Sequence, residues 1–136
     1  MKTPFLVLAA LAVPCLALAQ QPTQAGRWIT ESGNLEIDVA PCGDALCGTV
    51  VRVLADRSMS ASGQAITPAD PRPALGMVIL SELRATGEGE LSGRIYNREN
   101  AKHYSVRLAP VQGDQMALRA YLGLPILGKT QVWKRP

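Results

Sequence analysis

The sequence predicts an all-β protein, built as a small antiparallel eight-stranded up-and-down β-barrel. After Gly26, apolar and polar residues alternate in short segments, as expected for strands with one buried face. Turn-forming residues separate most of these segments by short connections, so strands that are consecutive in the sequence should be antiparallel neighbours. Closing eight such strands into a barrel removes the unpaired sheet edges.

The first part of the barrel is expected to contain three strands. Residues 26–31 form the first strand, and Ser32-Gly33-Asn34 turn the chain into a second strand at residues 35–39, where Leu, Ile and Val alternate with acidic residues. A loop with two cysteines follows. Residues 46–54 then form a third strand, because the β-branched valines in this segment favour extended backbone.

Strand patterns resume after residue 73. The connections in this region contain Thr-Gly-Glu-Gly, Arg-Glu-Asn-Ala, Gln-Gly-Asp and Gly-Leu-Pro, which are typical of turns. The five remaining strands are expected at residues 75–84, 91–97, 103–110, 115–122 and 127–135.

A long loop is expected at residues 55–73, which are rich in Ser, Ala, Gly, Pro and Asp and show no sustained period. Loops of this length in small domains are usually either functional or mobile. Asp70 and Arg72 lie between prolines that stiffen the chain. Two interpretations fit this pair: an internal ion pair that pins the loop over one barrel end, or part of a lid at a ligand entrance.

Residues 1–19 are expected to be a cleaved secretory signal. Lys2 precedes an apolar run, and small residues stand before Gln20, where signal peptidase cuts. A transmembrane helix is the alternative, but a span needs about 20 apolar residues, and this run is shorter and contains Pro14. We therefore expect cleavage near Ala19, one barrel domain at residues 20–136, and a periplasmic or secreted protein.

Cleavage of the signal leaves Cys42 and Cys47 as the remaining cysteines, and an oxidising compartment favours a disulfide between them. A metal site is the alternative, but zinc needs about four ligands, and the single histidine, His103, is distant in the sequence. We expect neither a metal nor a cofactor. The net charge of +3 at pH 7, which falls by one when Lys2 is removed, does not indicate a nucleic-acid partner.

The barrel interior has few aromatic residues to fill it. The one phenylalanine lies in the expected signal. An eight-stranded barrel is either filled by its own side chains or holds one small ligand, and the sequence is compatible with both. The aromatic residues downstream of the signal are Trp28, Tyr96, Tyr104, Tyr121 and Trp133.

Arginine and tyrosine residues gather on one face of the second half of the barrel. Alternation places Ile95, Tyr104, Val106, Leu108, Met116 and Leu118 on the opposite, apolar face. The first set forms either a solvated outer surface or, in part, a cavity mouth for an anionic or sugar-like group, which arginine forks suit. Together with Asp70 and Arg72, the candidate ligand-binding residues are Arg94, Tyr96, Arg107, Arg119 and Tyr121.

No catalytic residue is assigned. His103 is the one side chain with an ordinary pKa near neutrality, but the spacing selects no nucleophile to accompany it. The sequence lacks a phosphate-binding glycine loop and a haem-attachment motif. We therefore expect a binding or interaction protein rather than an enzyme.

The chain ends resemble those of calycin barrels, the superfamily that includes lipocalins. Gly26-Arg27-Trp28 looks like the Gly-x-Trp motif of the first strand, which meets an arginine near the last strand. The resemblance implies structural roles for Trp28, Trp133 and Arg135. Trp28 would plug the closed end, with the Arg135 guanidinium across its indole.

A fuller resemblance covers nearly the whole chain after the signal and is to the bacterial family known as domain of unknown function 2147. It implies a small exported protein with a cysteine pair, and no activity. The chain departs from the family pattern at Asn100-Ala101-Lys102, where Asp-Gly-Lys is usual, and at Leu91-Ser92, where a tryptophan is expected. The resemblance rests on Gly26-Arg27-Trp28, Cys42, Leu46-Cys47-Gly48, Asp70-Pro71-Arg72-Pro73, Gly76, Gly93-Arg94-Ile95-Tyr96, Lys102, Tyr104-Ser105, Tyr121-Leu122-Gly123 and 127–135.

These observations favour a module of the bacterial envelope that binds a small, envelope-associated or lipid-like ligand. The alternative is an accessory or inhibitor protein whose basic face contacts an envelope enzyme. An enzyme acting on an envelope polymer is the third interpretation. The sequence identifies neither the ligand nor the partner.

Overall fold

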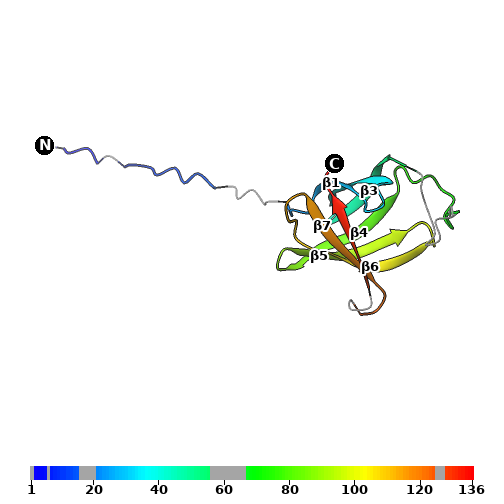
Figure 1. The fold of residues 1–136 in the computed structure, drawn as a ribbon. Helices are drawn as coiled ribbons and strands as arrows, with labels where there is room; N and C mark the ends of the chain where they lie inside the picture. Colours follow the sequence, from blue (N-terminus) through cyan, green and yellow to red (C-terminus); the bar gives the residue numbers. More distant parts are fainter. Residues whose placement is uncertain (1, 6, 16–20, 56–66, 125–127) are drawn as a thin grey trace.

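The computed structural model describes residues 2–5, 7–15, 21–55, 67–124 and 128–136 (Figure 1). Within them, the eight expected strands form one closed barrel, and each strand pairs antiparallel with its neighbours in the sequence. The last strand closes the ring against the first through Ile29 and Lys134. The strands are β1 (Gly26–Ile29), β2 (Leu35–Cys42), β3 (Ala45–Val53), β4 (Val78–Gly87), β5 (Glu90–Asn97), β6 (Lys102–Leu108), β7 (Gln115–Tyr121) and β8 (Lys129–Lys134).

The fourth strand begins three residues later than the expected residue 75. Residues 74–77 instead form a turn, in which Met77 N–H donates to Ala74 O over 3.0 Å. Gly76 adopts a φ of 83°, a left-handed conformation that glycine tolerates and a strand does not use. Apolar spacing alone cannot separate such a turn from the strand that follows. The last expected strand began at residue 127, which lies outside the described residues.

The interior follows the predicted alternation of the strands. Ile95, Val106, Leu108, Met116 and Leu118 are buried, and Tyr104 packs against them while partly exposed. The other half of the core comes from β1–β4, as the strand patterns require. Its buried residues are Trp28, Ile37, Val39, Leu46, Val50, Ile79, Leu80 and Leu83.

Gly93 lets two strands approach closely where the barrel bends. A Cβ at this position would lie 2.5 Å from Ser81 O and 2.9 Å from Glu82 O. Glu82 itself adopts a φ of 54°, and the β4–β5 register shifts between Ser81 and Arg84. Such irregularities bend a strand and allow a sheet to close. The glycine of the Gly-Arg-Ile-Tyr segment is therefore required by backbone packing.

One end of the barrel is sealed by Trp28, which is fully buried. The Arg135 guanidinium carbon lies 3.7 Å from the centroid of the Trp28 rings. Arg135 also donates to the backbone oxygens of Thr23, Ala25 and Arg27. These contacts confirm the cation–π role that the calycin-like chain ends imply.

Gln24 completes this seal from the segment that precedes β1. Its side chain is fully buried, and Nε2 donates to Gly89 O at 2.6 Å and to Ala109 O at 3.2 Å. Its backbone oxygen accepts a hydrogen bond of 2.8 Å from Trp28 Nε1. A buried amide is stable only with such partners, so this residue ties the N-terminal segment to two connections of the barrel.

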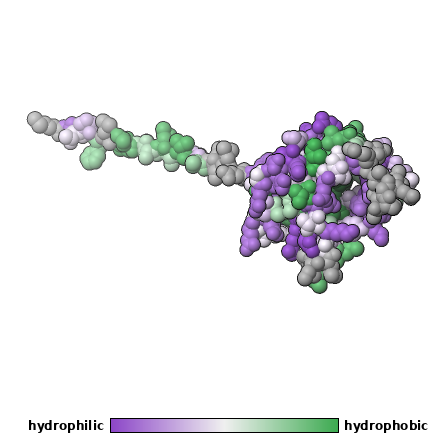
Figure 2. Space-filling model, in the orientation of Figure 1, coloured by the Kyte–Doolittle hydropathy of each residue, from purple (hydrophilic) through white to green (hydrophobic). Residues whose placement is uncertain are grey.

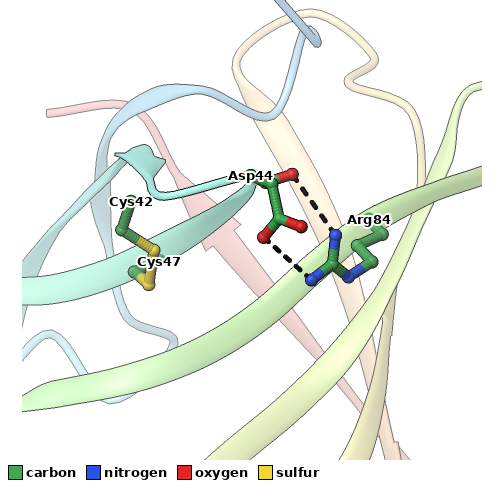
Figure 3. Close-up of a disulfide and its surroundings, with 4 residues drawn as sticks. All are labelled: Cys42, Asp44, Cys47 and Arg84. Atoms are coloured by element: carbon green, nitrogen blue, oxygen red, sulfur yellow. Dashed lines mark hydrogen bonds and ion pairs between the residues drawn. A yellow bond between two sulfur atoms is a disulfide. The ribbon is translucent and has the colours of Figure 1, made fainter.

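The predicted disulfide between Cys42 and Cys47 is present in the β2–β3 hairpin, with Cα atoms 5.8 Å apart (Figure 3). At the hairpin tip, Asp44 forms an ion pair of 3.0 Å with Arg84 of β4. The hairpin is thus joined covalently within itself and by charge to the next strand.

The N-terminal segment extends away from the barrel (Figure 1), and the side chains of Phe5, Val7, Leu8, Leu11 and Val13 are 85% to 96% exposed. The described barrel therefore makes no use of these side chains in its core. No helix in the described ranges has both the length and the apolar character needed to cross a membrane.

Candidate functional site

The barrel end opposite Trp28 contains a cavity of about 1180 Å³. Its described lining comes from the ends of β3, β5 and β7, from β2, β4, β6 and β8, and from the connections β1–β2, β3–β4, β5–β6 and β7–β8. This volume is sufficient for one small organic ligand.

The cavity exists because side chains near this end are too short to fill the barrel. On β7, the inward-facing Met116 and Leu118 are buried, but the next inward position is Ala120, which lines the cavity. The bottom of the space is apolar and includes Ile95 and Trp133, both buried. A ligand that enters would therefore meet an apolar surface below the mouth.

Polar groups interrupt this apolar wall at a few positions. Tyr104 Oη accepts a hydrogen bond of 2.7 Å from Asn100 Nδ2, so its own hydroxyl hydrogen remains available for donation. Gln131 Oε1 accepts a hydrogen bond of 3.1 Å from Trp133 Nε1, and its amide nitrogen donates no hydrogen bond to the described residues. The wall can therefore orient a polar group through hydrogen bonds.

The mouth carries charges of both signs. Glu31 lies on the β1–β2 connection, Arg98 and Glu99 lie together on the β5–β6 connection, and Lys129 begins β8. In the described part of the chain, the Nε of Arg98 and the Oδ1 of Asn34 are buried without a hydrogen-bond partner. Such atoms carry a desolvation cost, and their gathering at the mouth marks this end as the polar side of the cavity.

Asp70 lies in a segment that is bound to one side of the mouth. We call residues 69–73 the strap. The Asp70 carboxylate accepts hydrogen bonds from Arg72 Nε at 2.9 Å and Arg72 Nη2 at 2.6 Å, and one of 2.7 Å from Tyr96 Oη. The Arg72 guanidinium and then the Tyr96 hydroxyl hold the pKa of Asp70 well below its usual range. The same carboxylate raises the pKa of Tyr96.

Backbone contacts dock the strap onto the β5–β6 turn. Ala69 N–H donates to Glu99 O over 3.0 Å, and Asp70 N–H donates to Arg98 O over 3.1 Å. Pro73, at the end of the strap, lines the cavity, whereas Asp70 and Arg72 are not among the described lining residues. The Asp70–Arg72 pair therefore pins the long connection at the mouth and fixes the shape of one cavity wall.

The remaining candidate residues divide into two groups. Tyr96 and Tyr121 line the cavity. Arg94 and Arg107 are exposed on the outer face of the barrel, where the Arg107 guanidinium lies 6.0 Å from the Tyr121 ring centroid. Arg119 shares this face and donates to Thr130 Oγ1 over 2.8 Å. The arginines and the cavity are thus separate features.

Sequence reasoning did not assign most of the lining residues to a ligand site. It gives Trp133 a structural role, although this residue also lines the cavity, and it does not single out Gln131 or Ala120. A signal for Gln131 was present, since alternation from Trp133 places this amide at an inward-facing position of β8. His103, which carries no assigned role, stacks on Tyr96 with ring centroids 4.8 Å apart.

A closed eight-stranded antiparallel barrel, sealed at one end and hollow at the other, defines a lipocalin-like protein. A comparison with solved structures supports this class. The barrel is similar to protein HP1028 from Helicobacter pylori, described as belonging to the lipocalin family, with a TM-score of 0.59, 20% sequence identity and 82% of each chain covered. At this identity the likeness concerns the fold.

The chain belongs to the bacterial family DUF2147, described as an uncharacterized protein conserved in bacteria, whose family model matches residues 26–135. This match confirms the family resemblance seen in the sequence. A comparison with curated proteins finds no match.

Proposed function

We propose that this protein is a binding module that holds one small ligand with an apolar body and a polar end. The observation that carries the proposal is the cavity of about 1180 Å³ at one end of a lipocalin-like barrel. If side chains filled the barrel completely, the inward position of Ala120 would carry a larger residue.

The chemistry of the wall indicates how such a ligand lies. Its apolar part contacts Ile79, Ile95 and Trp133, which line the cavity and are buried. Its polar end faces the hydroxyl of Tyr104, the amide of Gln131 and the mixed charges of the mouth. This arrangement suits lipid-like molecules, because burying an apolar chain supplies affinity and a few hydrogen bonds fix orientation.

The proposed setting is the bacterial envelope, after removal of the signal near Ala19. The pattern of residues 1–19 supports export, as does the exposure of the leader's apolar side chains outside the barrel. N-terminal sequencing of the protein from a periplasmic extract or from the medium tests this setting. A chain that begins at Gln20 is expected, and an intact leader on most of the protein would contradict it.

Native mass spectrometry of the exported protein tests the binding function. We expect a fraction of the molecules to carry one additional small mass, which organic extraction removes. Refilling is followed with the apolar fluorophore N-phenyl-1-naphthylamine, whose entry quenches Trp133 in the cavity wall. The Trp133→Phe variant is the matched control, because it keeps the apolar wall and loses the signal. Absence of both a retained mass and any saturable quenching would overturn the proposal.

A further inference from the structure

The outer face of β5–β8 carries three arginines in two rows that cross the strands. In the first row, Arg107 of β6 stands directly opposite Arg119 of β7. In the second row, Arg94 of β5 is aligned through its β6 partner with Tyr121 of β7. We call the two exposed arginines, Arg94 and Arg107, the basic face. The other described members of the two rows are Ser92, Ser105 and Thr130, so the rows contain no carboxylate.

On the opposite side of the barrel, the arginines have a carboxylate partner. Arg27 and Arg52 flank Glu36 on the outer surface of β1–β3, with ion pairs of 3.2 Å and 3.4 Å. For Arg94 and Arg107, the described residues provide no such ion pair. Arg94 and Arg107 are both exposed. They therefore offer two cations on one outer surface to an anionic partner.

Two exposed leucines adjoin the basic face at the open end. Leu122 and Leu124 follow the last residue of β7 and are 63% and 65% exposed. They lie directly after β7, on the described part of the β7–β8 connection at the bottom of Figure 1. Lys129, also exposed, begins β8 on the far side of this connection. Figure 2 shows many hydrophilic residues on the face of the barrel that this view presents.

We propose that the basic face and Leu122 and Leu124 dock the barrel onto an anionic phospholipid surface. The leucines enter the boundary between head groups and acyl chains, and the arginines behind them meet phosphates, for which the planar guanidinium fork is suited. This order places two exposed apolar side chains just beyond the end of β7 and the cations beside them. A protein interface would instead place its apolar anchors at the centre of a patch with polar groups around them. The docked barrel holds the cavity mouth next to the lipid.

Vesicle sedimentation tests the proposal. Protein is mixed with vesicles of phosphatidylglycerol and phosphatidylethanolamine, or with vesicles of phosphatidylcholine alone, and all samples compared have the same N-terminus. We expect binding to the anionic vesicles that weakens as salt is added. Near an anionic membrane each cation contributes roughly fivefold in partitioning, so Arg94→Gln combined with Arg107→Gln should weaken binding about 25-fold. Leu122→Gln combined with Leu124→Gln should weaken it as well.

Two control variants locate the surface. Leu75→Gln removes a leucine of similar exposure, 62%, from the β3–β4 connection. Arg27→Gln removes one positive charge from the β1–β3 face. Both should bind anionic vesicles nearly as the parent does. Equal binding to the two vesicle types, or equal losses in the control and test variants, would overturn the proposal. If the protein does not bind anionic vesicles at low salt, lipid docking is rejected. The basic face would then be a candidate surface for an acidic protein partner.

Discussion

Tyr96 donates its hydroxyl hydrogen to Asp70 Oδ2 over 2.7 Å and so joins β5 to a residue 26 positions earlier in the chain. Tyr96 is also a lining residue of the cavity. The bond therefore links the strap to the wall of the proposed binding site. Its strength should affect both the stability of the fold and the access of a ligand to the cavity.

Replacing Asp70 with Asn should lower the melting temperature at neutral pH and abolish part of the acid sensitivity. The pKa of Asp70 is held below its unfolded value of about 3.9. The charged carboxylate thus stabilises the fold above about pH 4, and this contribution is lost as the pH falls toward the lower folded pKa. The difference in melting temperature between parent and variant should be constant from about pH 5 to pH 8 and shrink below about pH 4.

Asp44→Asn is the matched control for this experiment. Asp44 also pairs with an arginine, Arg84, but its side chain is 85% exposed. Exposed ion pairs contribute little to stability. The control should melt close to the parent temperature at every pH. If both variants lost the same amount, the Asp70 carboxylate would have no special role in holding the strap.

Filling the cavity should prevent binding without unfolding the barrel. Ala120→Phe places a ring into the cavity from the inward face of β7. Ala117→Phe adds the same ring to the outward face of the same strand. We expect the first variant to reduce quenching of Trp133 by the apolar fluorophore at least tenfold, and the second to leave it unchanged. Equal responses would place the ligand outside the cavity.

The sealed end should depend on Gly26. This residue has a φ of 102°, and a Cβ there would lie 2.9 Å from Arg135 Nη1. Gly26→Ala should therefore lower the free energy of unfolding by about 1–2 kcal/mol, because alanine disfavours this backbone conformation. It should lower it further by disturbing the contact of Arg135 with Trp28. Gly33→Ala measures the backbone contribution to this loss of stability alone, because Gly33 has a φ of 75° and open space around it. Chemical denaturation should show a larger loss for Gly26→Ala. Equal losses would remove Arg135 from the explanation.

Loss of the disulfide should lower stability by about 2 kcal/mol, because the closed loop is short. The double variant Cys42→Ser and Cys47→Ser tests this by urea denaturation, with an unchanged slope if the native barrel is kept. In protein that keeps residues 1–19, Cys15→Ser should have no effect, since Cys15 is exposed and unpaired. A loss well above this amount would mean that the hairpin contributes through strained or altered packing.

The eight strands were predictable because their information is local. Alternation in a segment such as residues 103–110 reports which side chains face the core, and turn residues mark where a strand ends. Errors were confined to the ends, as at Ala74–Met77, where an apolar turn precedes β4. The Cys42–Cys47 pair was equally local, because five positions separate the two residues.

The cavity and the strap could not be predicted from local sequence patterns. Whether Ala120 leaves a space depends on side chains from β4, β5 and β8 that meet it across the barrel. The contact of Asp70 with Tyr96 joins segments whose separation has no periodic signal. The sequence also placed Tyr96 and Tyr121 with the arginines on one face, and only the structure shows that the two tyrosines reach the cavity lining.

By itself, then, the sequence determined the strand order, the disulfide and the Gly26, Trp28 and Arg135 seal, since each follows from short-range pattern or a known pairing of motifs. The tertiary structure decided that the interior is hollow at one end, that the strap borders its mouth, and that the basic face lies outside. The physical reason is that volume and charge in a closed barrel are set by side chains that are distant in the chain and adjacent in space.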